Sequence, residues 1–379
     1  MVNRKKILFL IESLSGGGAE KILTIILNNI NTNKFDVTLC CVVNVGHFLK
    51  DIPNNITYQY LIKDPNELHS LWEKLKYIIK YKLIYYWLPL KWVYKLWVPK
   101  ENDIEIAFVE GFSTKLLSHS HLKTEKIAWL HTDFSYNHWT SIIFTNKKQE
   151  ENAYSKFNKV VCVSNVVKDG LLKLYPRLNN VIVKYNPIDN VKILSLAQNN
   201  NLRLSSSSVK LVSTGRLVHQ KGYDRLLPII KNIIDEGYDV TLTILGEGSE
   251  RAKLEDYIAK SNLKEHIFLP GFVKNPYAEM VQHDIFVCSS RVEGYSTAVT
   301  EALILGLPVV TTECSGMEEL LGKNNEYGVI VKNDDESLYN GIKYFIDNPS
   351  SIELYTKKAK ERGNDFSLTS LMNDIEDIL

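Results

Sequence analysis

The sequence has 379 residues and a net charge of +1; 45% of its residues are hydrophobic and 23% are charged. A chain of this length is long for one hydrophobic core and suits two domains, and its composition excludes an intrinsically disordered protein. The near-neutral charge gives no general case for nucleic-acid binding, so any basic function must be local.

Short runs rich in β-branched residues alternate with helical patterns along the whole chain, which is typical of parallel sheets built from β-α-β units. The expected strands of the first half are KKILFLI, FDVTLCCVV, NITYQYL, DIEIAFV, EKIAWL, KVVCVS and NVIVKY. Those of the second half are VKLVST, DVTLTIL, HIFLPG, DIFVCSS, LPVVTT and YGVIVK. The pattern predicts two doubly wound, Rossmann-like parallel sheets, with ligands at the carboxyl ends of the strands.

The segment between the halves, SLAQNNNLRLSSSS at 195–208, is rich in Asn and Ser and is expected to be a linker. The first domain is then expected at residues 1–194 and the second at 209–365. Residues 366–379 are expected to form a C-terminal helix able to pack back on the first domain. If the carboxyl ends of the two sheets face each other, the active site lies in the cleft between them.

The chain starts with MVNRKK, and its first apolar run ends at Glu12, too soon for a signal sequence or a membrane span. The five cysteines have no metal-ligand spacing, and four of them stand in strand-like runs. Reduced, buried thiols in a cytoplasmic protein are therefore expected.

Three glycines at 16–18 precede a helix. Their backbone amides can form an anion-binding nest; the alternative is an ordinary tight turn.

Residues 74–100, KLKYIIKYKLIYYWLPLKWVYKLWVPK, hold seven lysines, three tryptophans and five tyrosines but no acidic residue. Lysines and Pro89 interrupt every apolar run well before it could span a membrane. One face of the helix expected after Pro89 carries Leu90, Val93, Tyr94 and Trp97. Trp and Tyr together with Lys are typical of an element that lies on anionic lipid. The expected membrane contacts are Lys91, Trp92, Lys95 and Trp97. The alternative is that the aromatic side chains pack into the first domain's core.

The pattern V-E-G-aromatic-S-T occurs twice, as FVEGFST at 108–114 and as RVEGYST at 291–297. In the second copy another carboxylate, Glu301, follows Glu293 inside an apolar helical run, whereas the same offset from Glu110 reaches Ser118. Only the second copy therefore has a second carboxylate, and the two copies are expected to have different roles.

In the second half, four successive strand ends carry Gly, charged or hydroxyl residues. The first ends in STGRLVHQKGYDRLL, where Arg216 and Lys221 flank a turn. A guanidinium binds two oxygens at once and an ammonium adds a mobile charge, so the pair suits a diphosphate. The alternative is two solvated loop cations. The next strands end in LGEGSE, with Gly246, and in PGFVKN at 270–275.

A helix is expected from Ser296 to Leu305, and its first amides would favour an anion. Glu301 would lie about 7 Å along this helix, where a carboxylate can accept from both hydroxyls of a ribose. Glu293, before the helix, could hold sugar hydroxyls. The alternative is that Glu293 caps the helix and Glu301 is a surface residue.

The motifs G-R-L-x-x-x-K-G, G-x-G, P-G-F and S-R-x-E-G-aromatic with E-x7-E occur here in this order. The set resembles the retaining GT-B glycosyltransferases of family 4, which build bacterial polysaccharides and glycolipids. The resemblance covers nearly all of 209–330 and extends to SLSGGGAEK at 13–21 and IAWLHTDF at 127–134. It implies a GT-B fold, in which two Rossmann-like domains face each other across a cleft.

The resemblance also implies a role for each matching residue. Arg216 and Lys221 would neutralise the donor diphosphate, and Glu301 would hold the ribose. Glu293 would contact the donor sugar, and Val273 would read the base through its backbone. His131 would stand beside the donor's anomeric carbon, and Glu110, in the acceptor domain, would contact the acceptor. The rest of the donor site would comprise Gly17, Gly18, Gly246, Gly294, Tyr295, Ser296 and Thr297. The family often has Gly and a bulky apolar residue at these last two positions, so a differently shaped sugar pocket is expected.

No D-x-D stands at a strand end and no His, Asp or Glu cluster has metal spacing, so neither a metal nor another cofactor is expected. The leaving diphosphate would be stabilised by Arg216, Lys221 and the helix near Ser296. The resemblance implies retention of the anomeric configuration. It also implies transfer from a nucleotide-sugar, most simply a UDP-sugar. The membrane contact expected for residues 74–100 adds a lipid-linked saccharide as the acceptor, at the inner face of the cell membrane. The alternatives are a GDP-sugar donor, a nucleotide-sugar epimerase and an inactive sugar-nucleotide-binding scaffold on the membrane.

Overall fold

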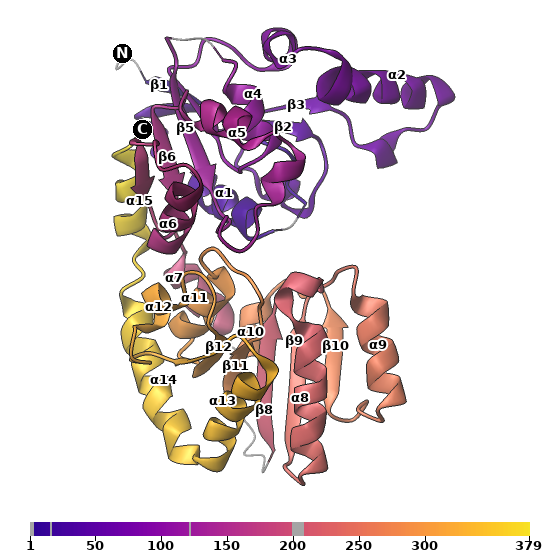
Figure 1. Cartoon of the computed structure of the whole chain (residues 1–379), viewed down its shortest axis with the longest axis vertical. Coiled ribbons are helices and arrows are strands. Elements are labelled where there is room, and N and C mark those ends of the chain that lie inside the picture. Colours follow the sequence, from indigo (N-terminus) through magenta and orange to yellow (C-terminus); the bar gives the residue numbers. More distant parts are fainter. Residues whose placement is uncertain (1–3, 16, 121–122, 199–207) are drawn as a thin grey trace. The chain divides into compact units, whose positions relative to one another are not determined.

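The structure is a computed structural model that describes residues 4–15, 17–120, 123–198 and 208–379. The chain divides into two compact units (Figure 1). Unit 1 comprises Met1–Pro187 together with Thr369–Leu379, and unit 2 comprises Ile188–Leu368. Each unit contains one parallel sheet, so the predicted pair of Rossmann-like sheets is confirmed.

The sheet of unit 1 has the order β3-β2-β1-β4-β5-β6-β7. Its strands are β1 Lys5–Ile11, β2 Phe35–Val43, β3 Thr57–Ile62, β4 Ile104–Ala107, β5 Glu125–Leu130, β6 Lys159–Cys162 and β7 Val181–Val183. The helices are α1 Gly18–Asn29, α2 Leu71–Lys82, α3 Leu90–Trp97, α4 Phe112–Leu117, α5 Lys147–Tyr154, α6 Asn165–Leu174 and α15 Leu368–Glu376, and a π-helix, η3, spans Leu83–Trp87. The central strands are buried on both faces, which is why they read as continuous apolar runs.

The sheet of unit 2 has the order β10-β9-β8-β11-β12-β13. Its strands are β8 Val209–Thr214, β9 Val240–Leu245, β10 Ile267–Gly271, β11 Ile285–Cys288, β12 Val309–Thr312 and β13 Val329–Val331. The helices are α7 Asn190–Ala197, α8 Tyr223–Asp235, α9 Arg251–Lys260, α10 Pro276–Met280, α11 Thr297–Ile304, α12 Met317–Leu321, α13 Asp335–Asp347 and α14 Pro349–Asn364. Two apolar clusters fill this unit. One joins α8 and α13 to the sheet, and the other joins α10, α11 and α12 to it.

Strand order reverses at one place in each sheet. In unit 1 this switch point lies between β1 and β4, and in unit 2 it lies between β8 and β11. Loops that leave the carboxyl ends of two such strands diverge to opposite faces of the sheet and open a crevice for ligands. The loops of interest are therefore those after β1 and β4 and those after β8 and β11.

The predicted domain boundary is corrected by the structure. The chain passes from unit 1 to unit 2 at Pro187–Ile188, before the predicted linker. Residues 190–197 form α7, and its Ile193 is buried in the core of unit 2. The prediction rested on the asparagines and serines of 195–208. The apolar side of α7, however, packs into the core of unit 2. Residues 199–207 of the predicted linker lie outside the described residues.

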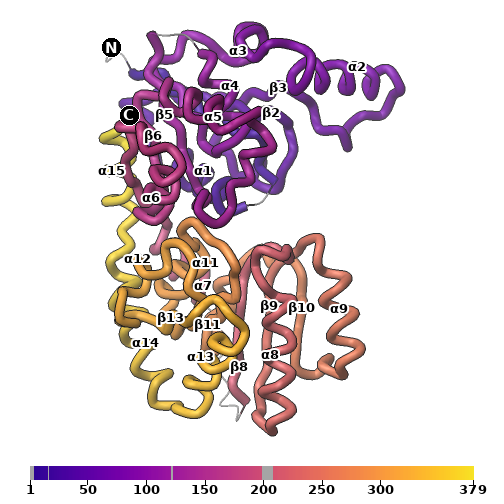
Figure 2. Tube along the Cα trace, in the orientation of Figure 1, coloured from indigo at the N-terminus to yellow at the C-terminus, as the bar shows by residue number. Residues whose placement is uncertain are grey.

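The last helix belongs to the first unit, where the prediction allowed it to pack. The side chain of Lys159 on β6 donates to the carbonyl of Ile378 at 2.9 Å, and that of Lys5 on β1 donates to the carbonyl of Leu379 at 2.7 Å. Ile375 of α15 is fully buried. Figure 2 shows α15 running beside β6 and α6. Unit 1 is therefore built from two separate parts of the sequence.

The aromatic and lysine-rich segment forms α2, η3 and α3, and α2 projects outward from unit 1 (Figure 1). The predicted contact face of α3 is partly wrong. Val93 is fully buried and Tyr94 donates to the Glu105 carboxylate of β4 at 2.7 Å, so that face packs on unit 1. Trp97 lies on the same face and is half-buried. Lys91, Trp92 and Lys95 are exposed, as predicted. Of the helices in the described ranges, none combines the length and apolar character needed to cross a bilayer.

Candidate functional site

Two loops of unit 2 interlock at the carboxyl ends of β8 and β11. The loop after β8 ends in a 3-10 turn, His219–Lys221, and the loop after β11 begins at Ser289. The Ser289 hydroxyl donates to the Lys221 carbonyl at 2.9 Å, and the Gln220 side chain donates to the Val292 carbonyl at 2.8 Å. These bonds hold the two predicted motifs against each other, although some 70 residues separate them in sequence.

Lys221 and Glu293 form the centre of this cluster. The Lys221 ammonium donates to Oε1 of Glu293 at 2.6 Å, and the Ser290 hydroxyl donates to the same oxygen at 2.6 Å. Their side chains are only 19% and 9% exposed. Burial alone lowers the pKa of Lys221, but the adjacent Glu293 carboxylate more than offsets this, and the net pKa lies above the usual range. The ammonium is therefore charged and fixed, with two further N–H groups available to an anion.

Arg225, which belongs to none of the predicted motifs, supports the same loop. From the first turn of α8 its buried guanidinium donates to the carbonyls of Ser289, at 3.0 and 2.7 Å, and Ser290, at 3.0 Å. It also donates to the Asn333 side chain at 2.7 Å. The arginine stands in the quoted stretch KGYDRLL, but its partners lie more than 60 residues away, so no local pattern could reveal the contact.

Two glycines allow close approach between neighbouring loops of unit 2. Gly222 adopts φ of 70°, in the left-handed region, and a Cβ there would lie 2.1 Å from the Ser289 carbonyl oxygen. Gly246, predicted to approach the donor, instead faces protein backbone: a Cβ would lie 2.0 Å from the Gly215 carbonyl oxygen. Close packing of the backbone therefore explains why a glycine stands at position 246. The role of this glycine in donor binding stays a prediction.

Arg216 differs from Lys221 in its surroundings. It lies in the same loop but is exposed, and no partner for its guanidinium occurs among the described side chains. Its own carbonyl accepts from the Val218 amide at 2.8 Å, which shapes the turn. An exposed, unpaired guanidinium at a strand end can engage an anion without first breaking an ion pair.

Helix α11 begins where it was predicted to begin. The Ser296 side chain caps it by accepting from the Val299 amide, so the alternative in which Glu293 is the cap is wrong. Glu301, the fifth residue of α11, is 4% exposed, and the Tyr277 hydroxyl lies 3.4 Å from its Oε1. The alternative in which Glu301 is a surface residue is therefore also wrong. A buried carboxylate on an apolar helix requires polar partners, and a ligand could supply further ones.

The remaining predicted donor residues lie around α11 and after β10. Gly294 is buried, while Tyr295, Thr297 and Val273 are half-buried. Tyr295 and Val273 pack against the apolar cluster beneath α11. Their contacts to a nucleotide-sugar stay predictions.

In unit 1, Glu110 and His131 meet at the ends of β4 and β5. Oε2 of Glu110 accepts from the backbone amide of His131 at 2.9 Å, and Oε1 accepts from the Trp139 indole at 3.2 Å. Glu110 is 2% exposed. Both carboxylate oxygens thus have protein partners, which favours a positioning role over the predicted contact with an acceptor; that contact stays a prediction.

The imidazole of His131 is held in one tautomer. Its Nε2 lies 2.9 Å from the Phe108 carbonyl oxygen, which can only accept, so Nε2 carries the proton. Burial lowers the pKa of His131, and the nearby Glu110 carboxylate only partly offsets this. A neutral ring with a protonated Nε2 presents Nδ1 as a hydrogen-bond acceptor.

The predicted anion nest after β1 is described in part. Gly16 lies outside the described residues, while Gly17 is the N-cap of α1 and Gly18 its first residue. A Cβ on Gly17 would lie 2.3 Å from the Glu20 carboxylate. The first turn of α1 therefore has an acidic neighbour, and its binding of a phosphate stays a prediction.

The repeated V-E-G pattern has a topological explanation. Glu110 follows β4 and Glu293 follows β11, and each of these strands pairs with the first strand of its sheet at the switch point. Both carboxylates are buried and both bind a neighbouring loop. Equivalent positions in two Rossmann-like units thus use the same local solution.

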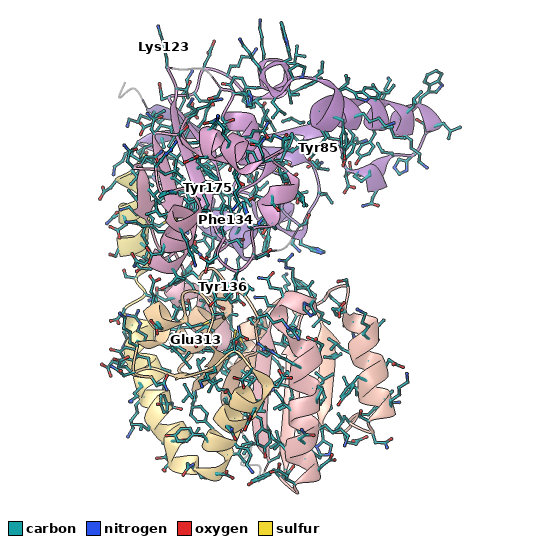
Figure 3. The ribbon with its side chains drawn as sticks, viewed as in Figure 1. Tyr85, Lys123, Phe134, Tyr136, Tyr175 and Glu313 are labelled. Atoms are coloured by element: carbon teal, nitrogen blue, oxygen red, sulfur yellow. The ribbon has the colours of Figure 1, made fainter. Side chains whose placement is uncertain are left out.

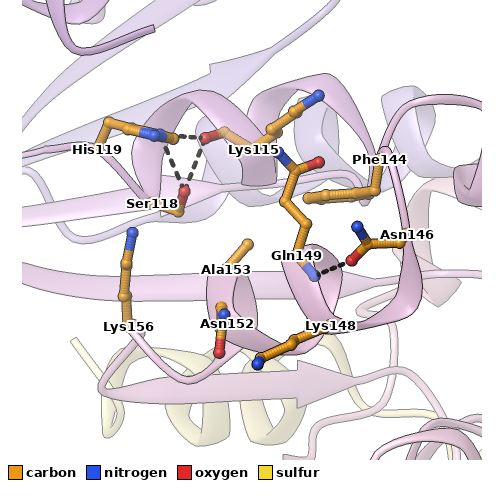
Figure 4. Close-up of a pocket in the computed structure, with 10 residues that line it drawn as sticks. All are labelled: Lys115, Ser118, His119, Phe144, Asn146, Lys148, Gln149, Asn152, Ala153 and Lys156. Carbon is orange, nitrogen blue, oxygen red and sulfur yellow. Dashed lines mark hydrogen bonds between the residues drawn. The ribbon is translucent and has the colours of Figure 1, made fainter.

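A surface cavity of about 320 Å³ between α4 and α5 contains none of the predicted site residues (Figure 4). It is lined by Lys115, Ser118, His119, Phe144, Asn146, Lys148, Gln149, Asn152, Ala153 and Lys156. In the described part of the chain, no three His, Cys, Asp or Glu side chains are grouped as metal ligands would be. The expectation that no metal is needed stays a prediction.

Residues 197–362 match the model of the family described as glycosyl transferases group 1. A Campylobacter jejuni relative is named N-acetylgalactosamine-N,N'-diacetylbacillosaminyl-diphospho-undecaprenol 4-alpha-N-acetylgalactosaminyltransferase. It is 34% identical over 166 residues, which is 43% of this chain and 44% of the relative. The Saccharomyces cerevisiae phosphatidylinositol N-acetylglucosaminyltransferase GPI3 subunit is 28% identical over 231 residues, 58% of this chain and 50% of the relative. The matches thus span half or less of the length of these curated relatives.

Among solved structures, Anabaena HepE in complex with UDP and glucose has a TM-score of 0.77 to this chain. The likeness covers 99% of both chains at 18% sequence identity. Together with the two parallel sheets, it establishes the predicted GT-B fold.

Proposed function

Since residues 197–362 form a glycosyl transferases group 1 domain within a GT-B fold, we propose that this chain is a glycosyltransferase that takes its sugar from a nucleotide-sugar. The observation that carries the proposal is the cluster at the carboxyl ends of β8 and β11. A fixed ammonium, Lys221, and an exposed guanidinium, Arg216, share one loop there, and the buried carboxylate Glu301 follows on α11.

The donor is a UDP-sugar in this proposal. Arg216 and Lys221 neutralise the diphosphate, and the first amides of α11, behind the Ser296 cap, add a partial positive charge. Glu301 accepts from the ribose hydroxyls. The solved structure of HepE with UDP and glucose supports this choice of base, because the same fold accommodates UDP there. A GDP-sugar is the alternative.

Transfer breaks the bond between the anomeric carbon and the diphosphate, so negative charge grows on the leaving oxygen. Lys221, held by Glu293, and Arg216 stabilise that charge without a metal ion in this proposal. The neutral His131 offers Nδ1 to a hydroxyl of the sugar or the acceptor. The anomeric configuration is retained, by attack on the face that the diphosphate leaves, and the leaving phosphate oxygen accepts the acceptor's proton.

The acceptor is a lipid-linked saccharide. Two relatives support this class, because their names place them on an undecaprenol diphosphate-linked saccharide and on phosphatidylinositol. Such acceptors are held in membranes, so the enzyme would work at the inner face of the cell membrane as a peripheral protein. Its five free, buried cysteines suit a reducing cytoplasm.

A panel of UDP- and GDP-sugars tests the proposal. Calorimetry should find binding of one nucleotide class, and release of the nucleoside diphosphate should accelerate when a lipid-linked saccharide is added. Release that needs no acceptor, together with an altered donor sugar, would indicate an epimerase. Binding without turnover for any acceptor would favour the inactive scaffold.

A further inference from the structure

Helix α2 exposes apolar side chains. None of its 12 residues is buried; Leu71 is 85% exposed and Trp72 is 73% exposed. Leu75, Ile78 and Ile79 are exposed as well. At 3.6 residues per turn these five side chains share one face of the helix, and exposed apolar faces of this kind mark a contact surface.

Lysines border this apolar face. Lys74 and Lys76 are exposed on its two sides, and the helix has only one acidic residue, Glu73. Glu73 is used in the capping box of α2, where its side chain accepts from the Ser70 amide at 3.1 Å. The charge bordering the apolar face is therefore positive, as in helices that lie in the interface of an anionic bilayer.

Exposed apolar and aromatic side chains accompanied by lysines continue through η3 and α3. Tyr86, Trp87, Trp92 and Leu96 are exposed, and each of the two tryptophans has a lysine over its ring: Lys82 at 5.5 Å from Trp87 and Lys95 at 5.1 Å from Trp92. Exposed tryptophans paired with lysines are typical of the headgroup region, where a ring can be half-immersed beside a charge.

We propose that α2, η3 and the outer side of α3 form a membrane-binding surface for an anionic bilayer. The apolar face of α2, from Leu71 to Ile79, enters the interface, and Lys74 and Lys76 contact lipid headgroups. The sequence alone pointed to α3 as the contact; the structure moves the main contact to α2, whose first residues precede the lysine-rich run.

Tyr85 connects this surface to the rest of unit 1 (Figure 3). Its hydroxyl donates to the Glu12 carboxylate at 3.2 Å, and its ring centroid lies 4.4 Å from that of Phe112. Glu12 follows β1 and Phe112 begins α4, two residues after Glu110, so the surface is fixed to the switch point of unit 1. A lipid-borne acceptor would thus be presented near that edge; this consequence alone rests on the proposed function.

Co-sedimentation with vesicles tests the surface without any glycosyl transfer. The full chain is mixed at low salt with vesicles of equal parts phosphatidylcholine and phosphatidylglycerol, or of phosphatidylcholine alone. We expect the wild type to sediment with the anionic vesicles and to be released by salt. Trp72→Ser with Leu75→Ser should abolish sedimentation, and Lys74→Glu with Lys76→Glu should remove the preference for anionic lipid.

Matched controls change the same residue types on unit 2. Val191→Ser with Leu354→Ser removes exposed apolar side chains there, and Lys264→Glu with Lys332→Glu reverses exposed lysines; both should sediment like the wild type. Because α2 has no buried residue and the control positions on unit 2 are exposed, all variants should keep the wild-type melting temperature and UDP affinity. Failure of UDP binding in the wild type would count against the proposed function and not against this surface.

The proposal is overturned if the wild type stays in the supernatant with anionic vesicles, or if Trp72→Ser with Leu75→Ser sediments unchanged. It is also overturned if the wild type is a dimer without lipid and this variant is a monomer, because α2 would then bind a second copy of the chain.

Discussion

Lys221 and Glu293 are 72 residues apart in sequence, and their side chains form a hydrogen-bonded ion pair of 2.6 Å in a largely enclosed position. Breaking such a pair from one side leaves an uncompensated charge, whereas removing both charges does not. The pair therefore allows stability and chemistry to be separated by experiment.

We expect Lys221→Met and Glu293→Gln each to lower the free energy of unfolding by about 3 kcal/mol, because one buried charge loses its partner. The double variant should recover much of this loss but remain inactive, because the diphosphate still lacks its ammonium. Urea unfolding and kcat/KM measure the two effects. Lys231→Met, which breaks an exposed pair with Asp235, is the control and should cost ~0–1 kcal/mol. A double variant with wild-type activity would remove Lys221 from the mechanism.

Arg216→Ala should leave the melting temperature unchanged, since this exposed guanidinium has no partner among the described residues. Its kcat/KM should nevertheless fall by a factor equivalent to about 2–4 kcal/mol, the usual cost of removing one electrostatic donor from a transition state. Arg177→Ala changes another exposed arginine and should alter neither property. Activity within a few-fold of the wild type would refute the assignment of Arg216 to the diphosphate.

Glu301→Gln tests the ribose contact. A charged acceptor of hydrogen bonds contributes about 1.5–3 kcal/mol, so UDP affinity should fall on the order of ten- to a hundredfold. Isothermal titration calorimetry with UDP measures this, and Glu318→Gln, an exposed carboxylate on α12, serves as the control. If the two variants bind UDP equally well, Glu301 does not hold the ribose.

The lowered pKa of His131 predicts a pH dependence of folding. Between its folded pKa and the unfolded value of about 6.5, the unfolded state binds more protons, so stability rises with pH through this window. One histidine contributes at most ~1.4 kcal/mol per pH unit. His119 and His283 also have lowered pKa values, through burial, so His131→Gln should reduce the slope without abolishing it. Urea unfolding at several pH values from about 6.5 downward measures the slope. An unchanged slope would show that the buried ring is not the titrating group.

The predicted strands agree with the structure because of burial. Parallel strands covered on both faces, such as β1 and β11, need apolar residues at nearly every position, and such runs are visible in sequence. The start of α11 could also be predicted from the sequence, because the N-cap Ser296 and the apolar helix that follows it are local features. The burial of Glu301 could be inferred in the same way, since its neighbours leave no polar face.

Contacts between distant residues could not be inferred. The bonds from Arg225 to Ser289, and from Glu110 to the His131 amide, depend on which loops the sheet brings together. The side of α3 that packs inward was assigned wrongly for a similar reason. Both sides of that helix carry aromatic residues, and only the bond from Tyr94 to Glu105 shows which one faces the unit.

Because Thr369–Leu379 belong to unit 1, a ribosome must finish all of unit 2 before the first unit can be completed. Until then β1 and β6 lack the carbonyls that Lys5 and Lys159 bind, and the surface that covers Ile375 is open to water. During translation, unit 2 can fold while unit 1 still waits for its last helix. Removal of Thr369–Leu379 would therefore be felt at the opposite end of the sequence, in the unit that is synthesised first.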